Sequence, residues 1–251
     1  GDIERVLNDP ITFEKDFGLV SAVGASRFNM NGSAWTNIRA KTQRYYAKAG
    51  RPSAAAAYRN IYEEELLKKS LSRPDDLENA ILTAALRCFF LALELDTEVR
   101  SFIPQFHKLR RMVELLQFRS WVSSKDDAVE LERIAVELNS IRQDLWNACQ
   151  GNSSVLTLLQ RFSSTGDQFP LETIFTDFVT NMFAGIETTT ASLAWMVDCL
   201  SRGKDVQEAL REDLNAGRED RIDGFRDECM RLFSPIPFVV RKLTQPATFG
   251  S

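Results

Sequence analysis

The sequence predicts a mainly α-helical fold that ends in a small amount of β-sheet. Between residues 35 and 233, apolar side chains recur every three or four positions, which is the spacing of one buried helix face. After this region, Pro235-Ile236-Pro237 cannot continue a helix, and residues 238–243 (Phe-Val-Val-Arg-Lys-Leu) have the β-branched content of a strand. We find no internal repeat and no linker, so the 251 residues are expected to form a single domain.

The first predicted helices are separated by turn residues. Gly50 and Pro52 end the first helix, and Ser53 is a candidate N-cap for the second, which has a run of alanines. Pro74 suits the first turn of the third helix, whereas Pro104 is expected to interrupt the helical pattern. The predicted helices of this half cover residues 35–48, 54–71, 74–95 and 106–121.

The later helices follow a loop that is expected at residues 123–127. Residues 170–202 are apolar around most of the helix circumference, which is typical of a central helix that is covered on several sides. Gly151 and Asn152 separate the two helices before it. The predicted helices of this half cover residues 128–148, 154–162, 170–202, 206–214 and 220–233.

Composition and charge exclude several classes of function. Lys and Arg number 31 against 35 Asp and Glu, and a net charge of −4 gives no basic footprint for nucleic acid. The single histidine, His107, excludes a multi-histidine metal site, and we expect it to be solvated or hydrogen-bonded. Four widely spaced cysteines indicate reduced thiols and a cytoplasmic protein. No stretch approaches the roughly 18 apolar residues that a membrane helix requires.

The segment 184–190 (Ala-Gly-Ile-Glu-Thr-Thr-Thr) is unusual within a predicted helix, because glycine and three consecutive threonines oppose helix formation. Ala184 and Gly185 carry so little bulk that a flat group can lie against the backbone. Threonine hydroxyls can bond to the carbonyl four residues back, and Glu187 beside the hydroxyl of Thr188 can pass protons inward. The same residues also fit a close crossing of two helices, with an exposed glutamate.

Two polar pairs are spaced for one helix face. Glu228 and Arg231 stand at i and i+3, ahead of the proline-rich break and the strand that carries Arg241. In isolation this pair is typical of a solvated surface. Trp35 and Arg39 stand at i and i+4, where an indole N–H and a guanidinium can hold a carboxylate. A cation–π pair on the surface has the same spacing.

The order of these motifs resembles the cytochrome P-450 family of haem-thiolate monooxygenases. The resemblance rests on the small-Gly-x-acid-Thr-Thr helix, then Glu-x-x-Arg, then a proline-rich break and a strand with arginine. Residues 6–13 are similar to the stretch that leads into the family's second helix, and Trp35 with Arg39 is similar to its next helix. The implied fold is the family's helical prism with a small β-sheet remnant, incomplete at both ends of this chain.

The resemblance also implies roles for residues on the oxygen side of a haem. Glu187 and Thr188 match the acid–alcohol pair that delivers protons there. Ala184 and Gly185 match the groove where oxygen and the edge of the substrate lie over the porphyrin.

On the other sides of the cofactor, the resemblance implies binding and structural roles. Trp35, Arg39 and Arg241 match groups that hold the two haem propionates, which are anions that need desolvated cations nearby. Glu228 and Arg231 match a buried pair that fixes the core around the haem.

The chain departs from the family pattern at the metal ligand. The family binds iron through a cysteine in a Phe-x-x-Gly-x-x-x-Cys-x-Gly loop that follows Glu-x-x-Arg. None of the four cysteines, at positions 88, 149, 199 and 229, lies in such a loop. We therefore expect haem to be absent or weakly bound in these residues alone, and their activity as an enzyme stays open.

Three hypotheses follow. The first is a truncated family member, related by resemblance to enzymes that hydroxylate apolar small molecules, and inactive alone. The second is one part of a split monooxygenase, which needs a complementary fragment and a redox partner protein. The third is a non-catalytic helical module that binds or activates a partner and self-associates through exposed apolar surface. Neither nucleic acid nor a membrane is an expected partner.

Overall fold

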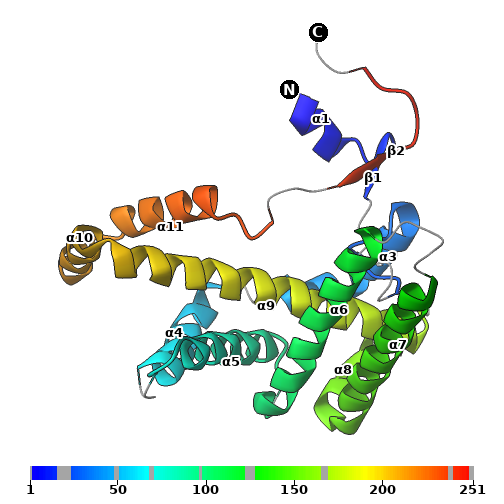
Figure 1. The fold of residues 1–251 in the computed structure, drawn as a ribbon, viewed down its shortest axis with the longest axis horizontal. Coiled ribbons are helices and arrows are strands. Elements are labelled where there is room, and N and C mark those ends of the chain that lie inside the picture. The colour runs from blue at the N-terminus through cyan, green and yellow to red at the C-terminus, as the bar shows by residue number, and fades with distance from the viewer. Residues whose placement is uncertain are drawn as a thin grey trace. The chain divides into compact units, whose positions relative to one another are not determined.

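The computed structural model describes residues 2–15, 24–47, 51–67, 71–95, 98–121, 128–164, 169–236 and 240–248. Over these ranges the fold is mainly helical with one two-stranded sheet, as the sequence predicts (Figure 1). The chain forms two compact units from interleaved segments. The first unit comprises Gly1–Ala55, Leu86–Phe183 and Val240–Ser251, and the second comprises Ala56–Ala85 and Ala184–Val239. In the ranges given above, no helix combines the length and apolarity needed to cross a membrane.

In chain order the elements are α1 (Asp2–Asn8), β1 (Phe13–Lys15), α3 (Gly32–Tyr46), α4 (Pro52–Leu66), α5 (Pro74–Ala92), the 3-10 helix η2 (Val99–Phe102), α6 (Ile103–Trp121), α7 (Ala128–Gly151), α8 (Ser153–Ser164), α9 (Leu171–Arg202), α10 (Lys204–Asn215), α11 (Asp220–Leu232) and β2 (Arg241–Leu243). The nine predicted helices correspond to α3–α11, whereas α1, β1 and η2 were not predicted. The predicted loop at residues 123–127 and the strand positions 238 and 239 lie outside the described residues.

Two predictions about proline were wrong. Pro52 is itself the first residue of α4, so Ser53 lies inside the helix and is not its N-cap. Pro104 does not interrupt a helix, because it lies in the first turn of α6. At both positions a proline costs little, since the first N–H groups of a helix have no partner within it.

The core of the first unit is aromatic. The ring of Phe90 lies 4.9 Å from that of Phe102 and 6.5 Å from that of Phe178, and all three side chains are at most 3% exposed. Tyr45 of α3 meets Phe162 of α8 edge to face, at 4.6 Å between ring centroids. Much of the phenylalanine content of this sequence is therefore core packing, in which each ring buries a large apolar area.

The second unit contains the C-terminal part of α9 together with α10 and α11. Here α11 runs back alongside α9, and the rings of Trp195 and Phe233 stack at 4.4 Å with 9° between their planes (Figure 1). Asp213 of α10 is buried and pairs with Arg218 and with Arg221, whose Nε lies 3.0 Å from its carboxylate. This carboxylate therefore fixes the turn that leads from α10 into α11.

Candidate functional site

Three cations of the first unit lie close together, and two of them lie over the ring of Trp35. The strands β1 and β2 pair antiparallel, with Lys15 directly opposite Arg241 although 226 residues separate them in sequence. The Nζ atom of Lys15 lies 4.7 Å from the centre of the Trp35 ring, and Cζ of Arg39 lies 4.8 Å from the same centre. The structure therefore brings together Trp35, Arg39 and Arg241, the three residues that the sequence analysis grouped, and adds Lys15.

These cations have no anionic partner within the part of the chain that the structure describes. Lys15 donates from Nζ to the carbonyl of Arg27 at 2.9 Å, and Arg39 donates from Nε to Oε1 of Gln43 at 2.6 Å. The Nη1 atom of Arg241 is buried and makes no hydrogen bond with any described group. Like charges placed opposite each other in a sheet are destabilising, and a buried donor without an acceptor costs more. Such an arrangement is typical of a site that receives an anion.

Electrostatics at Lys15 agree with this interpretation. Its pKa falls from 10.5 to about 8, first because burial removes the ammonium from water, and then because Arg241, Arg27 and Arg39 repel it. A carboxylate placed among these groups would favour the charged lysine and offset the repulsion. Sequence reasoning missed Lys15, because a three-residue strand carries too little periodicity to reveal its partner or its exposed face.

This shift gives a test of the cluster. Because the pKa of Lys15 is about 8 in the folded chain and near 10.5 when unfolded, the unfolded state binds more protons between these values, and stability rises with pH there. We expect the urea midpoint to increase between pH 8 and 10 by more in the wild type than in Lys15→Met. Lys242→Met, at an exposed lysine on β2, is the matched control and should follow the wild type. Equal pH profiles for all three proteins would contradict a half-buried Lys15 that is crowded by other cations.

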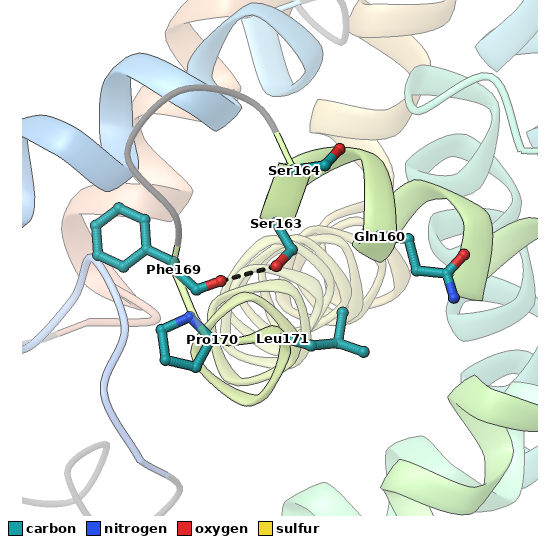
Figure 2. A pocket seen from close by; sticks show the side chains of 6 residues that line it. All are labelled: Gln160, Ser163, Ser164, Phe169, Pro170 and Leu171. Atoms are coloured by element: carbon teal, nitrogen blue, oxygen red, sulfur yellow. Dashed lines mark hydrogen bonds between the residues drawn. The ribbon is translucent and has the colours of Figure 1, made fainter.

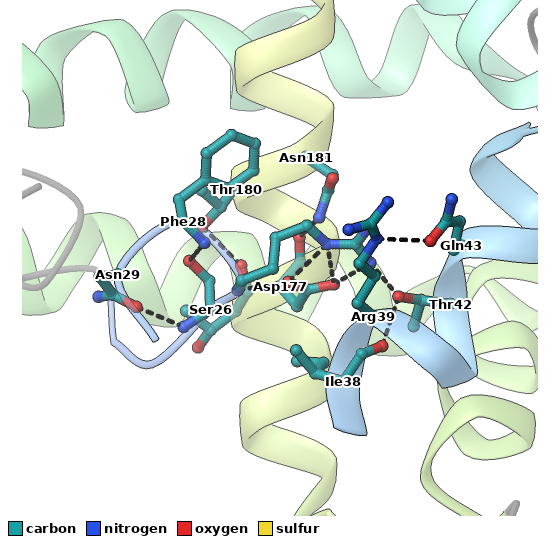
Figure 3. A network of polar contacts seen from close by, with 12 residues as sticks. Ser26, Phe28, Asn29, Ile38, Arg39, Thr42, Gln43, Asp177, Thr180 and Asn181 are labelled. Carbon is teal, nitrogen blue, oxygen red and sulfur yellow. Dashed lines mark hydrogen bonds and ion pairs between the residues drawn. The ribbon is translucent and has the colours of Figure 1, made fainter. Parts of the chain in front are cut away.

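A buried ion pair between Asp177 and Arg27 holds the segment around Arg27, which in turn positions Lys15. Figure 3 shows the polar network around Asp177. The carboxylate of Asp177, on α9, is 1% exposed and accepts from the backbone N–H of Arg27 at 2.8 Å and from its Nη2 at 2.9 Å. Arg27 also donates to Thr42 of α3 and stacks against the ring of Tyr46, 4.7 Å from its centre.

The segment around Arg27 is also hydrogen-bonded directly to β1. Besides the bond from Lys15 Nζ to the Arg27 carbonyl, the backbone N–H of Lys15 donates to Oδ1 of Asn31 at 3.2 Å. Burial and the charge of Asp177 raise the pKa of the Tyr46 hydroxyl, so this phenol stays neutral. Asp177 thus acts on the cation cluster through Arg27, across 150 residues of sequence.

The residues predicted for the oxygen side lie on α9, in the second unit. The helix is continuous from Leu171 to Arg202, so the glycine and threonines do not break it. Thr188 donates to the carbonyl of Ala184 at 2.8 Å and Thr189 to that of Gly185 at 2.7 Å, which confirms the predicted bonds to the preceding turn. A side chain built on Gly185 would meet no atom within 4 Å among the described residues, so the helix surface is open there. Glu187 and Thr188 are both half-buried.

One hydroxyl of this helix was not anticipated. Thr190 is 3% exposed, and its Oγ1 atom makes no hydrogen bond with any group that the structure describes. In the sequence, Thr190 cannot be distinguished from its neighbours Thr188 and Thr189. Only the orientation of the helix shows that Thr190 is the buried one.

The prediction that Glu228 and Arg231 are buried was wrong for this structure. The two side chains form a double hydrogen bond, with distances of 2.7 and 2.6 Å, but they are 55% and 66% exposed. The residue that α11 buries here is Cys229, and positions one before and two after it point about 100° and 200° away around a helix. The hydrogen bond to Arg231 lowers the pKa of Glu228, so the pair is charged.

A separate hollow lies at the start of α9 (Figure 2). It measures about 520 Å³, and Ser163 spans one side of it with a 2.7 Å hydrogen bond to the carbonyl of Phe169. The described residues that line it carry no ionisable side chain: Gln160, Ser163, Ser164, Phe169, Pro170 and Leu171.

The cysteines and the histidine do not form a metal centre in the ranges that the structure covers. Burial raises the pKa of Cys88 to about 11 and that of Cys149 to about 12, so both remain thiols. His107 is exposed on α6, as expected for a solvated histidine.

Comparisons with known proteins agree with the fold and with the family that the sequence resembles. Residues 24–251 match the family model described as cytochrome P450. A putative cytochrome P450 137 of Mycobacterium tuberculosis is 26% identical over 144 residues, which are 57% of this chain and 30% of the relative. A putative cytochrome P450 138 of the same organism is 25% identical over 207 residues, 75% of this chain and 47% of the relative.

Among solved structures, the retinoic acid bound cyanobacterial CYP120A1 has the same fold, with a TM-score of 0.68 at 17% identity. The similarity covers 96% of this chain and 60% of that one. The matched region spans less than half the length of the two mycobacterial relatives.

Proposed function

This chain belongs to the cytochrome P450 family. We propose that its first unit supplies residues that bind haem propionates, and that its second unit supplies the proton-delivering residues of a monooxygenase. The observation that supports this proposal most is the cation cluster of Lys15, Arg39 and Arg241, which has no anionic partner among the described residues. By resemblance, the substrates are apolar small molecules.

The residues present fit the carboxylate end of a haem. Arg241 offers a buried donor that lacks an acceptor, and an anion beside Lys15 would offset the burial and the repulsion that lower its pKa to about 8. Trp35 adds a flat surface and an indole N–H, so the cluster can hold two carboxylates of one planar ligand. Haem, when bound, supplies the redox chemistry that activates dioxygen.

On α9, this chain's own residues can move a proton. The Thr188 hydroxyl donates to the Ala184 carbonyl, which leaves its oxygen free to accept a hydrogen bond from water or from a protonated acid. To pass a proton onward, the hydroxyl must rotate away from that carbonyl, and the half-buried Glu187 one position earlier can return a proton to it. The open surface beside Gly185 leaves room for a flat group.

The thiolate ligand of the family is not among these 251 residues in the expected loop pattern. We therefore expect added haem to bind without a thiolate: the reduced, CO-treated complex should not show the Soret position that gives the family its name. A titration of purified protein with haem, followed by reduction under CO, measures this. A complete shift to the thiolate position would contradict the proposal that the sulfur ligand lies outside these residues.

A second candidate function is a helical module that binds a partner or a complementary fragment. It is favoured by large apolar side chains that stay exposed in the second unit: Trp195 at 43%, Leu232 at 54% and Ile236 at 53%. The same titration separates the two candidates, because a partner module without a haem pocket should show no saturable haem binding.

A further inference from the structure

Two cysteines of the second unit face each other across two helices. The stacked rings of Trp195 and Phe233 fix the register between α9 and α11, which run in opposite directions (Figure 1). Cys199 lies one helical turn after Trp195, and Cys229 lies one turn before Phe233. In an antiparallel pair, these opposite offsets bring the two cysteines to the same level, one turn away from the ring stack.

The side-chain contacts agree with this register. The thiols of Cys199 and Cys229 interact electrostatically, and both are free. Cys229 is 5% exposed, whereas Cys199 is half-buried and can be reached by a small reagent. The other two cysteines, Cys88 and Cys149, belong to the first unit.

We propose that Cys199 and Cys229 are a site of reversible oxidation, and that they close into a disulfide when a low-molecular-weight disulfide such as oxidised glutathione is the oxidant. The thiolate of Cys199 attacks one sulfur of the reagent and releases one glutathione thiolate. The thiolate of Cys229 then attacks the Cys199 sulfur and releases the second glutathione. The two protein thiols together lose two protons and two electrons, and the glutathione disulfide is reduced to two thiols.

The closed disulfide joins the helix of Glu187 and Thr188 to the helix of Glu228 and Arg231, so it fixes two segments that carry the family motifs.

Burial, followed by the contact with Cys199, raises the pKa of Cys229 to about 11. The second step is therefore slow at neutral pH, within the range of seconds to hours that is usual for thiol exchange.

The folded wild-type protein tests this inference directly. It is incubated with oxidised glutathione, acidified, alkylated in denaturant and digested, and the peptides are identified by mass spectrometry. We expect one cross-linked pair, Cys199 with Cys229, while Cys88 and Cys149 are alkylated. Cys149→Ser is the matched control variant and should form the same cross-link.

Oxidation in urea is the second control, because an unfolded chain should give a mixture of pairings. Alkylation of both Cys199 and Cys229 in the folded protein would overturn the proposal. So would separate glutathione adducts on each of them, or cross-links to another cysteine.

Discussion

Asp177→Ala should lower the free energy of unfolding by about 3–5 kcal/mol, as expected when one partner of a buried ion pair is removed. The carboxylate is 1% exposed, and the guanidinium of Arg27 that it binds is 15% exposed. Its loss leaves a nearly buried cation and the backbone N–H of Arg27 without their acceptor. Urea denaturation followed by circular dichroism measures the change.

The matched control is Asp198→Ala, which removes a carboxylate from the same helix. Asp198 is 36% exposed and pairs with Arg202, which is 77% exposed, so we expect a change of at most about 1 kcal/mol. Arg27→Lys should fall between the two variants, because it keeps a charge and the backbone bond but loses the fork of the guanidinium. Equal losses of unfolding free energy for Asp177→Ala and Asp198→Ala would contradict a buried ion pair between Asp177 and Arg27.

Arg241→Ala should weaken haem binding by about 10- to 100-fold, the range expected for the loss of one hydrogen bond to a charged group. The buried Nη1 atom of Arg241 lacks an acceptor within the described chain, and a propionate would supply one. Haem titration at neutral pH, with thermal unfolding to verify the fold, measures the effect.

Lys242→Ala is the control for charge. Lys242 follows Arg241 on β2, so its side chain points to the opposite face of the strand, and it is exposed. We expect its haem affinity to stay within about twofold of the wild type. If both variants lose the same affinity, net charge and not the cluster explains the binding.

Long periodic segments were predictable from sequence, and short pairings were not. The helix predicted over residues 170–202 forms from Leu171 to Arg202, because an apolar pattern of that length has no plausible alternative. The strand β1 has three residues, and its partner strand begins 226 positions after its last residue, so no local pattern indicates their pairing. Lys15 was missed for the same reason.

The same distinction holds for the candidate site: contacts within one helix were predictable, and contacts between distant segments were not. The spacing of Trp35 and Arg39 predicts a shared helix face, and in the structure the two side chains are in contact on one helix. The contact of Asp177 with Arg27 depends on tertiary structure alone, since the sequence around neither residue indicates that the other is its partner. The adjacency of Glu228 and Arg231 was predictable, whereas their burial depends on which side of α11 packs, and Cys229 occupies that side.

The most direct test compares haem with its dimethyl ester, in which both propionates are neutral, on the wild-type chain and on Arg241→Ala. If the cations of β1, α3 and β2 recognise carboxylates, the ester should bind the wild type at least about tenfold more weakly than haem, and this preference should shrink in the variant. Equal affinities of the wild type for the two ligands, or no saturable binding of haem, would contradict the account.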